Sequence, residues 1–552
     1  MISNSLPFDP ETVVRDRFAA ASIPVVAIEL RRYPDETIVI VRVAESDSSA
    51  AVDLSNSIDR DLQSVGFNGF VTIRREQSPE GASGTLDKGV ADARATELAN
   101  LLTARSRTSE IQPSLSYIRD AAQNIVTATT PRHHLIFGRR GAGKTALMVE
   151  AKTQIEQLGH LSAWINLQTL RNESVDRVLL WISKDICDAL QAGYRERGKS
   201  DAVVSDLGAT RRDIEGLLGA LHEPPSRHVQ QLMPRLQSVI SHATTRMGVR
   251  LYVFVDDLQY IARDRQAALL DMVHGSMRDC DAWMKVAAIK HLSRWFRSDP
   301  PTGLQSGHDA GLIDLDVTLE NPSKAKAFLE TVLKSYAKYV GIGSLRSVFS
   351  SEALDRLVLA SGAVPRDYLV ISAGAIVQAQ RRPKARIVGA QDVNKTAGDA
   401  ASVKVTELED DVASAGAGPQ GILDGLQRVK EFCLNQRKCT YFRIDYLDKE
   451  ARATEYGVLQ SLMDLRLVHL VNSGVSDERE AGRKSEVFML DLSQFSGERL
   501  KRGLRVLDFV SGSLVVKETS KLEKIGNTPK QLLGLLRRGP LFPLATLSVE
   551  GA

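Results

Sequence analysis

The sequence has few cysteines, few aromatic residues and no long apolar segment. Its four cysteines, Cys187, Cys280, Cys433 and Cys439, show no C-x-x-C spacing, which supports neither a disulfide framework nor a zinc module. No apolar run approaches the roughly 18 residues of a membrane-spanning helix. The start of the chain, MISNSLPFDPETVV, lacks the charged-then-apolar order of a signal peptide. We therefore expect a cytoplasmic protein with no membrane partner.

The sequence also lacks an excess of charge of one sign. Its net charge is +3, so bulk electrostatics give no case for nucleic-acid binding, and any such binding must come from a local patch. With 43% hydrophobic and 25% charged residues, the composition is that of a soluble globular protein. A length of 552 residues predicts several domains.

One glycine-rich stretch, GRRGAGKT (138–145), matches the phosphate-binding pattern G-x-x-x-x-G-K-[ST] at every fixed position. It lies between the apolar run HHLIF (133–137), typical of a buried strand, and the helical stretch TALMVEAKTQIEQL (145–158). Glycines let backbone N–H groups turn toward phosphates at the start of that helix. The predicted nucleotide-binding residues are Gly138, Arg139, Arg140, Gly141, Ala142, Gly143, Lys144, Thr145 and Ala146.

Within this loop two side chains have predicted roles toward ATP and Mg²⁺. Lys144 is expected to reach the β- and γ-phosphates, and the Thr145 hydroxyl is expected to ligate the metal. Nothing in the sequence separates ATP from GTP.

Two carboxylates follow the apolar strand RLYVFVDDLQ (250–259), at the end where ligands lie in open α/β sheets. Asp256 is the candidate metal ligand. Asp257 is the candidate base that polarises the attacking water. The alternative is that the pair only caps the next helix. Because aspartate is one methylene shorter than glutamate, turnover is expected to be slow.

Alternating strand and helix patterns predict an α/β fold with a parallel sheet covered on both faces. Residues 1–76 form a small α/β domain, 77–104 a linker and helix, 105–320 a P-loop ATPase core, and 321–400 a helical lid. The long separation of Lys144 from Asp256 predicts an insertion at 195–245.

After a linker at 401–419, residues 421–495 have the pattern of a winged helix. The stretches GILDGLQRVKEFCLNQ, FRIDYLDKE and TEYGVLQSLMDLRLV are expected to be its helices, and VHLVNS and SEVFMLDL its strands. Within 452–466, the region of the expected recognition helix, the charges of Arg452, Glu455, Asp464 and Arg466 cancel.

The remaining residues, 496–552, read as a basic extension. Its cations could hold the backbone of duplex DNA without reading sequence, or form a solvated face: Lys517, Lys521, Lys524, Lys530, Arg537 and Arg538.

The stretches GRRGAGKT, WINLQT, VFVDDLQ, MKVAAIKH and SGAVPRDYL together resemble the initiator-type branch of the AAA+ ATPases, akin to origin-recognition proteins, and its STAND relatives. The resemblance covers about 105–400, with the winged helix appended. It implies a sensor-1 role for Lys290 or His291 near the γ-phosphate, although the usual Asn or Thr is missing there. It also implies a sensor-2 role for Arg366 and an arginine finger at Arg294 or Arg297, given to a neighbouring subunit.

Three functions fit these observations. The first is an ATP-hydrolysing switch or loader that couples nucleotide state to homo-oligomerisation and to DNA or a protein client. The second is a STAND-like signalling ATPase, plausibly in bacterial defence, whose winged helix packs on the nucleotide. The third is a module that holds ATP without turnover.

Overall fold

The structure is a computed structural model, and it divides into two compact units: residues 1–87 with 338–344, and residues 88–337 with 345–552. It describes residues 9–21, 23, 25–32, 37–44, 48–64, 67, 69–76, 89–106, 118, 123–199, 202–220, 226–400, 419–477, 480, 482–496, 502–510, 513–519, 524–525 and 529–548. Residues 77–88 of the linker and helix expected at 77–104, and residues 401–418 of the linker expected at 401–419, lie outside the described residues.

The first unit holds a three-stranded sheet with the order β1-β2-β3. Its elements are α1 (Pro10–Ala20), β1 (Val25–Arg32), β2 (Thr37–Ala44), α2 (Ser48–Ser64) and β3 (Gly69–Glu76), at the places where the sequence predicts helices and strands. Strands β1 and β2 are antiparallel, while β2 and β3 are parallel and joined through α2. Alternate β2 residues, Val39, Val41 and Val43, enter a core shared with Phe18 of α1.

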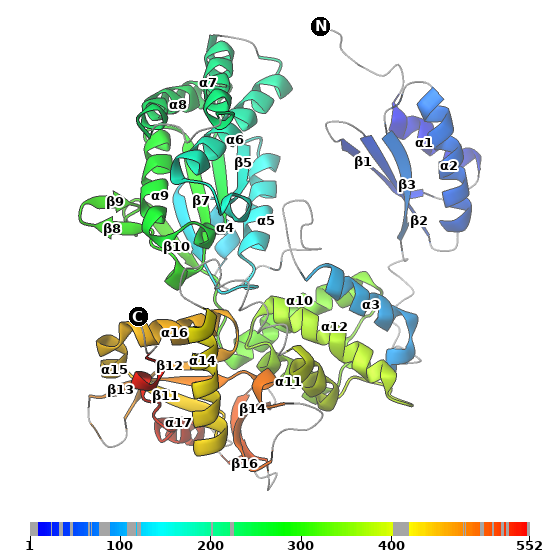
Figure 1. Cartoon of the computed structure of the whole chain (residues 1–552). Helices are drawn as coiled ribbons and strands as arrows, with labels where there is room; N and C mark the ends of the chain where they lie inside the picture. The colour runs from blue at the N-terminus through cyan, green and yellow to red at the C-terminus, as the bar shows by residue number, and fades with distance from the viewer. Residues whose placement is uncertain are drawn as a thin grey trace. The chain divides into compact units, whose positions relative to one another are not determined.

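The second unit is built on a five-stranded sheet with the order β10-β4-β7-β6-β5 (Figure 1). All neighbouring strands run parallel. Their carboxyl ends therefore meet at one edge. The strands are β4 (His133–Phe137), β5 (Leu161–Asn166), β6 (Leu251–Asp256), β7 (Ala282–Ala288) and β10 (Ala310–Asp314).

Helices cover both faces of this sheet, as the apolar strands predict. Ile136 and Phe254 face α4 (Asn124–Thr129) and α5 (Lys144–Gln157). Their neighbours along the strands face the opposite core, formed with α6 (Val175–Glu196), α8 (Ser226–Met247) and α9 (Arg263–Met277). The range 195–245, expected as an insertion, contains α7 (Ala202–Leu218) and most of α8.

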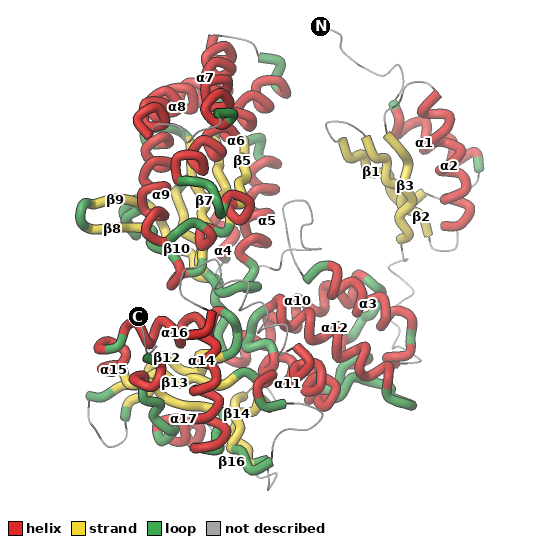
Figure 2. The backbone as a smooth tube through the Cα atoms, viewed as in Figure 1, coloured by secondary structure: helices red, strands yellow, loops and turns green. Residues whose placement is uncertain are grey.

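The range 321–400, predicted as a helical lid and called the lid below, contains α10 (Pro322–Tyr339), α11 (Ser351–Ala360) and α12 (Pro365–Arg381), and helix also spans 390–400. Helix α3 (Ala93–Ala104), which precedes the ATPase core in sequence, packs along α12 (Figure 2). Gln380 Nε2 of α12 donates hydrogen bonds to the Val90 carbonyl and to Thr96 Oγ1. Helix α3 therefore packs with the helices of the lid.

The domain at 419–496 contains α14 (Pro419–Lys430), a π-helical turn (Glu431–Gln436), β11 (Tyr441–Asp445), α15 (Tyr446–Ala451), α16 (Ala453–Asp464), β12 (Val468–Ser476) and β13 (Lys484–Leu490). Its antiparallel sheet has the order β11-β13-β12. The helix predicted for FRIDYLDKE is wrong in its first half. Tyr441–Asp445 pair with β13 instead, because Phe442 and Ile444 become fully buried in this position.

Residues beyond 496 are not a plain extension but contain β14 (Arg505–Val510), β15 (Ser513–Glu518), β16 (Lys524–Ile525) and α17 (Pro529–Arg537). The buried Asp508 of β14 pairs with Arg356 of α11 and with Lys517, so one predicted DNA-binding cation is already neutralised. Lys521 lies outside the described residues. None of the described helices combines the length with the apolar composition that spanning a bilayer demands.

Candidate nucleotide site

The phosphate-binding loop connects β4 to α5 and turns through glycines in left-handed conformations. Gly141 has φ +81° and Gly143 has φ +100°, values that disfavour any residue with a Cβ. Lys144, the first residue of α5, is buried, and its Nζ donates hydrogen bonds to the carbonyl oxygens of Gly138 at 2.8 Å and Arg139 at 3.3 Å. Burial lowers the pKa of this amine, and nearby carboxylates, Asp257 first, oppose the shift.

The loop and the end of β6 meet directly. Thr145 Oγ1 donates a 2.8 Å hydrogen bond to Asp256 Oδ2, although β7 separates β4 from β6 in the sheet. Asp256 is 2% exposed, and its other oxygen, Oδ1, has no hydrogen-bond partner within the described part of the chain. Burial, followed by the charge of Asp257, raises the pKa of Asp256 to about 7.

These atoms fit a magnesium ion. A hydroxyl and a carboxylate oxygen left without a partner are hard oxygen donors, and Mg²⁺ is usually held by one or two carboxylates together with substrate phosphates. No cluster of three or more acidic, histidine or cysteine side chains that could hold a metal occurs among the described residues. The site therefore suits a metal brought with a nucleotide better than a metal held by protein ligands alone.

Asp257 lies beside this pair in a left-handed conformation, with φ +63°. Its Oδ1 accepts a 2.7 Å hydrogen bond from Gln259 Nε2, which fixes the carboxylate at the end of β6. Aspartate is one of the few side chains that tolerate this backbone conformation.

The strand order, the loop after β4 and the carboxylates after β6 together decide the fold. The core is an α/β P-loop fold, with a five-stranded parallel sheet and a phosphate-binding loop whose Thr145 meets Asp256 at the end of β6. No protein-family model and no curated protein sequence matches the chain.

Three similar solved structures are distant from this chain in sequence and in shape. Aeropyrum pernix Orc1 in complex with DNA is 15% identical, with a TM-score of 0.32 over 75% of this chain and 92% of that one. A Thermotoga maritima RuvB variant is 11% identical, with a TM-score of 0.29 over 70% and 93%. AMPPCP-bound DnaA from Aquifex aeolicus is 12% identical, with a TM-score of 0.23 over 65% and 90%. At these values the fold assignment rests on the strand order and the site geometry.

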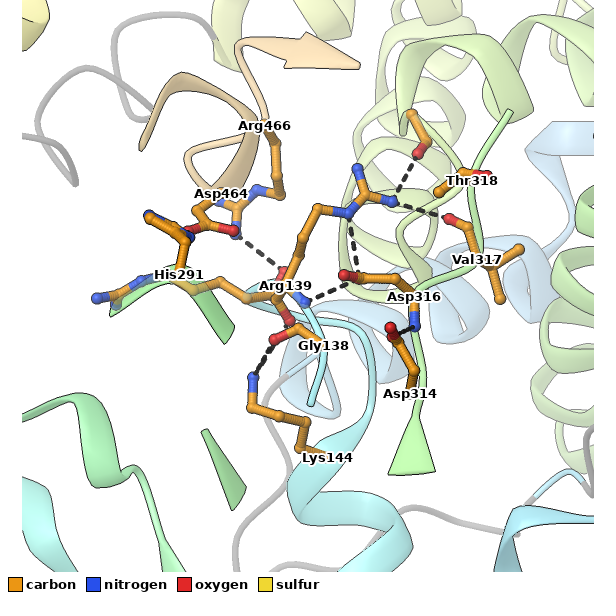
Figure 3. Close-up of polar contacts among 12 residues, drawn as sticks. Gly138, Arg139, Lys144, His291, Asp314, Asp316, Val317, Thr318, Asp464 and Arg466 are labelled. Atoms are coloured by element: carbon orange, nitrogen blue, oxygen red, sulfur yellow. Dashed lines mark hydrogen bonds and ion pairs between the residues drawn. The ribbon is translucent and has the colours of Figure 1, made fainter. Parts of the chain in front are cut away.

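The two arginines of the loop point to different places. Arg139 is 6% exposed and reaches toward the lid: its guanidinium contacts Asp316 Oδ1 at 3.2 Å, the Val317 carbonyl at 2.8 Å and the Gly362 carbonyl at 3.4 Å (Figure 3). Its backbone N–H also donates to Asp316 Oδ1. The Arg139 side chain thus ties the loop to the segment before α10 and to the turn between α11 and α12.

Arg140 is half-buried, and its guanidinium lies 5.9 Å from the centre of the Tyr260 ring.

Arg366, the predicted sensor 2, lies at the first turn of α12 against the loop. Its backbone N–H donates to the Gly141 carbonyl at 3.3 Å, and a Cβ at Gly141 would come within 2.7 Å of the Arg366 Cβ. The lid helix therefore begins in contact with the phosphate-binding loop.

The other predicted residues follow β7. Lys290 is exposed, whereas His291 is partly buried and contacts Asp464. Arg294 is exposed, and its backbone N–H donates to Gln266 Oε1. Arg297 lies on the hairpin of β8 (Phe296–Ser298) and β9 (Pro301–Gly303). Among the described contacts, none joins Lys290, Arg294 or Arg297 to the phosphate-binding loop, so their sensor and finger roles stay predictions.

Sequence reasoning missed the residues that the 419–496 domain brings to this site. Arg466 Nη1 lies 3.5 Å from the Arg140 carbonyl, and its Nε lies 3.0 Å from Asp367 Oδ2 in α12. The ring of His469 packs against Gly362 so closely that a Cβ there would lie 2.0 Å from Cε1. Asp316 had a detectable signal, a carboxylate just past an apolar strand. Asp464 and Arg466 had none, because in the sequence they read as cancelling charges of the expected recognition helix.

Proposed function

We propose that this protein is an ATP-binding and slowly hydrolysing switch of the initiator-like AAA+ class, which couples its nucleotide state to the position of its C-terminal domain. The observation that carries the proposal is the 2.8 Å hydrogen bond between Thr145 and Asp256. This contact supports the proposal that one Mg²⁺–triphosphate group meets both the hydroxyl of the loop and the carboxylate of β6.

In this proposal each side chain has a defined task. Lys144 binds the β- and γ-phosphates, while Thr145 and Asp256 hold the metal, which would neutralise the charge developing on the phosphates. Asp257 orients and polarises the attacking water. Arg366, at the start of α12, carries the state of the γ-phosphate to the lid.

The test is calorimetric titration of the full chain with ATP and MgCl₂. Lys144→Ala is expected to abolish detectable binding, because the loop loses its only side-chain cation that contacts the phosphates in this proposal. Lys152→Ala, on the following turns of α5 and paired with Glu156, is the matched control and is expected to bind like wild type. Equal ATP affinity of Lys144→Ala and wild type would refute the proposal.

Hydrolysis is tested separately from binding. Asp257→Asn is expected to bind ATP with unchanged affinity and to release phosphate at least 100-fold more slowly, the lower bound typical of a lost general base. Turnover at the wild-type rate would place the base elsewhere. No turnover in wild type would favour the module that holds ATP without hydrolysis.

The second candidate is a STAND-like signalling ATPase. The contacts of Arg466 with the loop and of His469 with Gly362 favour it, because they join the 419–496 domain, which we take as a winged helix, to the ATPase core. Mass photometry with and without ATP, a partner lysate and duplex DNA distinguishes the candidates. Assembly that needs DNA supports a loader, and ATP-driven assembly without DNA supports the signalling switch.

The proposal also includes duplex DNA as a partner of the 419–496 domain. The helix α16, the expected recognition helix, is partly covered by the chain's own end: Ser548 Oγ donates a 3.0 Å hydrogen bond to Glu455, and residues Leu544–Leu547 pack on α16. Fluorescence anisotropy with duplex DNA across a salt series tests this. Affinity that falls steeply with salt would support phosphate contacts, and absence of binding at low salt would remove DNA as a partner.

A further inference from the structure

Asp464, the last residue of α16, brings a buried carboxylate to the edge of the phosphate-binding loop. Asp464 Oδ2 lies 2.6 Å from His291 Nδ1, on the 3-10 turn that follows β7 (Figure 3). Asp464 is 8% exposed. A buried acid at a domain contact has to be balanced by its surroundings, since an isolated charge is costly away from water.

The groups around the Asp464–His291 pair come from each element packed against it. The charged and titratable side chains are Arg139, Arg140, Lys144, Asp316, Arg263, Arg466 and Asp367. Burial first, and then the charge of Asp316, raises the pKa of Asp464 to about 8, while Arg139, Lys144 and Arg140 oppose the shift. Burial lowers the pKa of His291 to about 4. The pair is therefore mainly neutral near pH 7, and Asp464 ionises above pH 8.

Neighbouring residues attach the turn between α16 and β12 to both the loop and the lid. Arg466, two residues after Asp464, adopts φ +60° and contacts the Arg140 carbonyl and Asp367 of α12. Three residues further on, His469 packs on Gly362, whose carbonyl accepts from Arg139. The 419–496 domain is thus joined, through one short segment, to the two parts of the ATPase that surround the proposed phosphate site.

We propose that Asp464 is a nucleotide-sensing residue that opposes the binding of phosphate charge at the loop. This rests on the proposed ATP site. The triphosphate adds negative charge beside Lys144, Arg139 and Arg140, the same cations that balance Asp464, and so it disfavours the ionised acid at this position. Phosphate binding and ionisation of Asp464 therefore compete, with ATP the stronger competitor than ADP because it carries more charge.

The test compares ATP affinity of the full chain, measured by calorimetry with MgCl₂ at pH 8.5 and pH 6.5, for wild type, Asp464→Asn and Glu450→Gln. Glu450 is an exposed acid on α15 and serves as the matched control for loss of one negative charge. Asp464→Asn is expected to bind ATP up to about fourfold more tightly than wild type at pH 8.5, the limit that a pKa of about 8 sets at this pH. At pH 6.5 the two proteins are expected to have nearly equal affinity, because Asp464 is already neutral there. Comparing proteins at one pH cancels the titration of groups they share.

Two results would overturn the inference while leaving the ATP site intact: equal affinity of Asp464→Asn and wild type at pH 8.5, or a gain that is the same at both pH values. Absence of ATP binding by wild type would instead overturn the proposed function and the inference with it.

Discussion

The two adjacent arginines of the phosphate-binding loop are predicted to differ sharply in what they contribute to stability. Replacing Arg139 by methionine keeps much of the length and removes the guanidinium. Because that group contacts Asp316, the Val317 carbonyl and the Gly362 carbonyl in a buried setting, its loss leaves acceptors without partners. Replacing Arg140 removes a side chain that is half-buried over the Tyr260 ring.

The magnitudes follow from these contacts. Removing one partner of a buried ion pair costs about 3–5 kcal/mol, and the lower figure applies here because the Asp316 side chain is 30% exposed and regains water. The geometry of the Gly362 contact, at 3.4 Å, adds little. We expect about 3 kcal/mol for Arg139→Met. For Arg140→Met we expect under about 1 kcal/mol, the value of an exposed cation–π contact.

Thermal unfolding of the two variants measures this difference directly. Arg139→Met is expected to lower the unfolding midpoint of the ATPase unit by on the order of 5 °C, and Arg140→Met by no more than about 2 °C. Circular dichroism before heating checks that both variants fold. Equal midpoints for the two variants would show that the buried contacts of Arg139 do not hold the loop to the lid, and the reasoning would fail.

Two further substitutions test other parts of the structure. Lys285 is fully buried in β7, with its Nζ bonded to the Thr130 and Arg132 carbonyls and to His134 Nδ1, and burial lowers its pKa to about 7. Between pH 7 and about 10.5 the unfolded chain holds a proton on Lys285 that the folded chain lacks. The free energy of unfolding of wild type should therefore rise with pH across this window, by up to about 5 kcal/mol relative to that of Lys285→Met. A difference between the two proteins in urea unfolding that does not change with pH would contradict this. Gly362→Ala puts a Cβ 2.0 Å from the His469 ring at φ +55°, and should cost on the order of 2 kcal/mol and speed hydrogen exchange of residues 466–472. Wild-type exchange in Gly362→Ala would show that this packing does not attach the 419–496 domain.

Strong local signals predicted the fold of the core. The run HHLIF coincides with β4, and the apolar residues before Asp256 coincide with β6, because buried parallel strands carry continuous apolar sequence. Gly141 and Gly143 of the loop adopt positive φ values, a conformation that glycine reaches more easily than other residues. Such features depend on residues next to each other in the chain, which is why they can be read without a structure.

What could not be predicted depends on distant pairing. Tyr441–Asp445 became a strand only because β13 lies beside it, and residues beyond 496 gained a sheet that packs on α11. Asp464 and Arg466 have ordinary helix-end sequences, and only the position of the domain gives them His291 and Asp367 as partners. Likewise, the loop pattern alone does not reveal that Arg139 turns toward the lid.

The most direct test of the central claim uses Mn²⁺ in place of Mg²⁺. Electron paramagnetic resonance then measures the binding of Mn²⁺ in the presence of a non-hydrolysable ATP analogue. If the phosphate-binding loop and the end of β6 share one metal–triphosphate group, wild type should bind Mn²⁺ tightly only with nucleotide and show coupling to phosphorus. Asp256→Asn should then lose at least tenfold in Mn²⁺ affinity, while Asp271→Asn, whose carboxylate bonds the Gly303 N–H away from the loop, should not. Mn²⁺ affinity unchanged in Asp256→Asn would contradict the account.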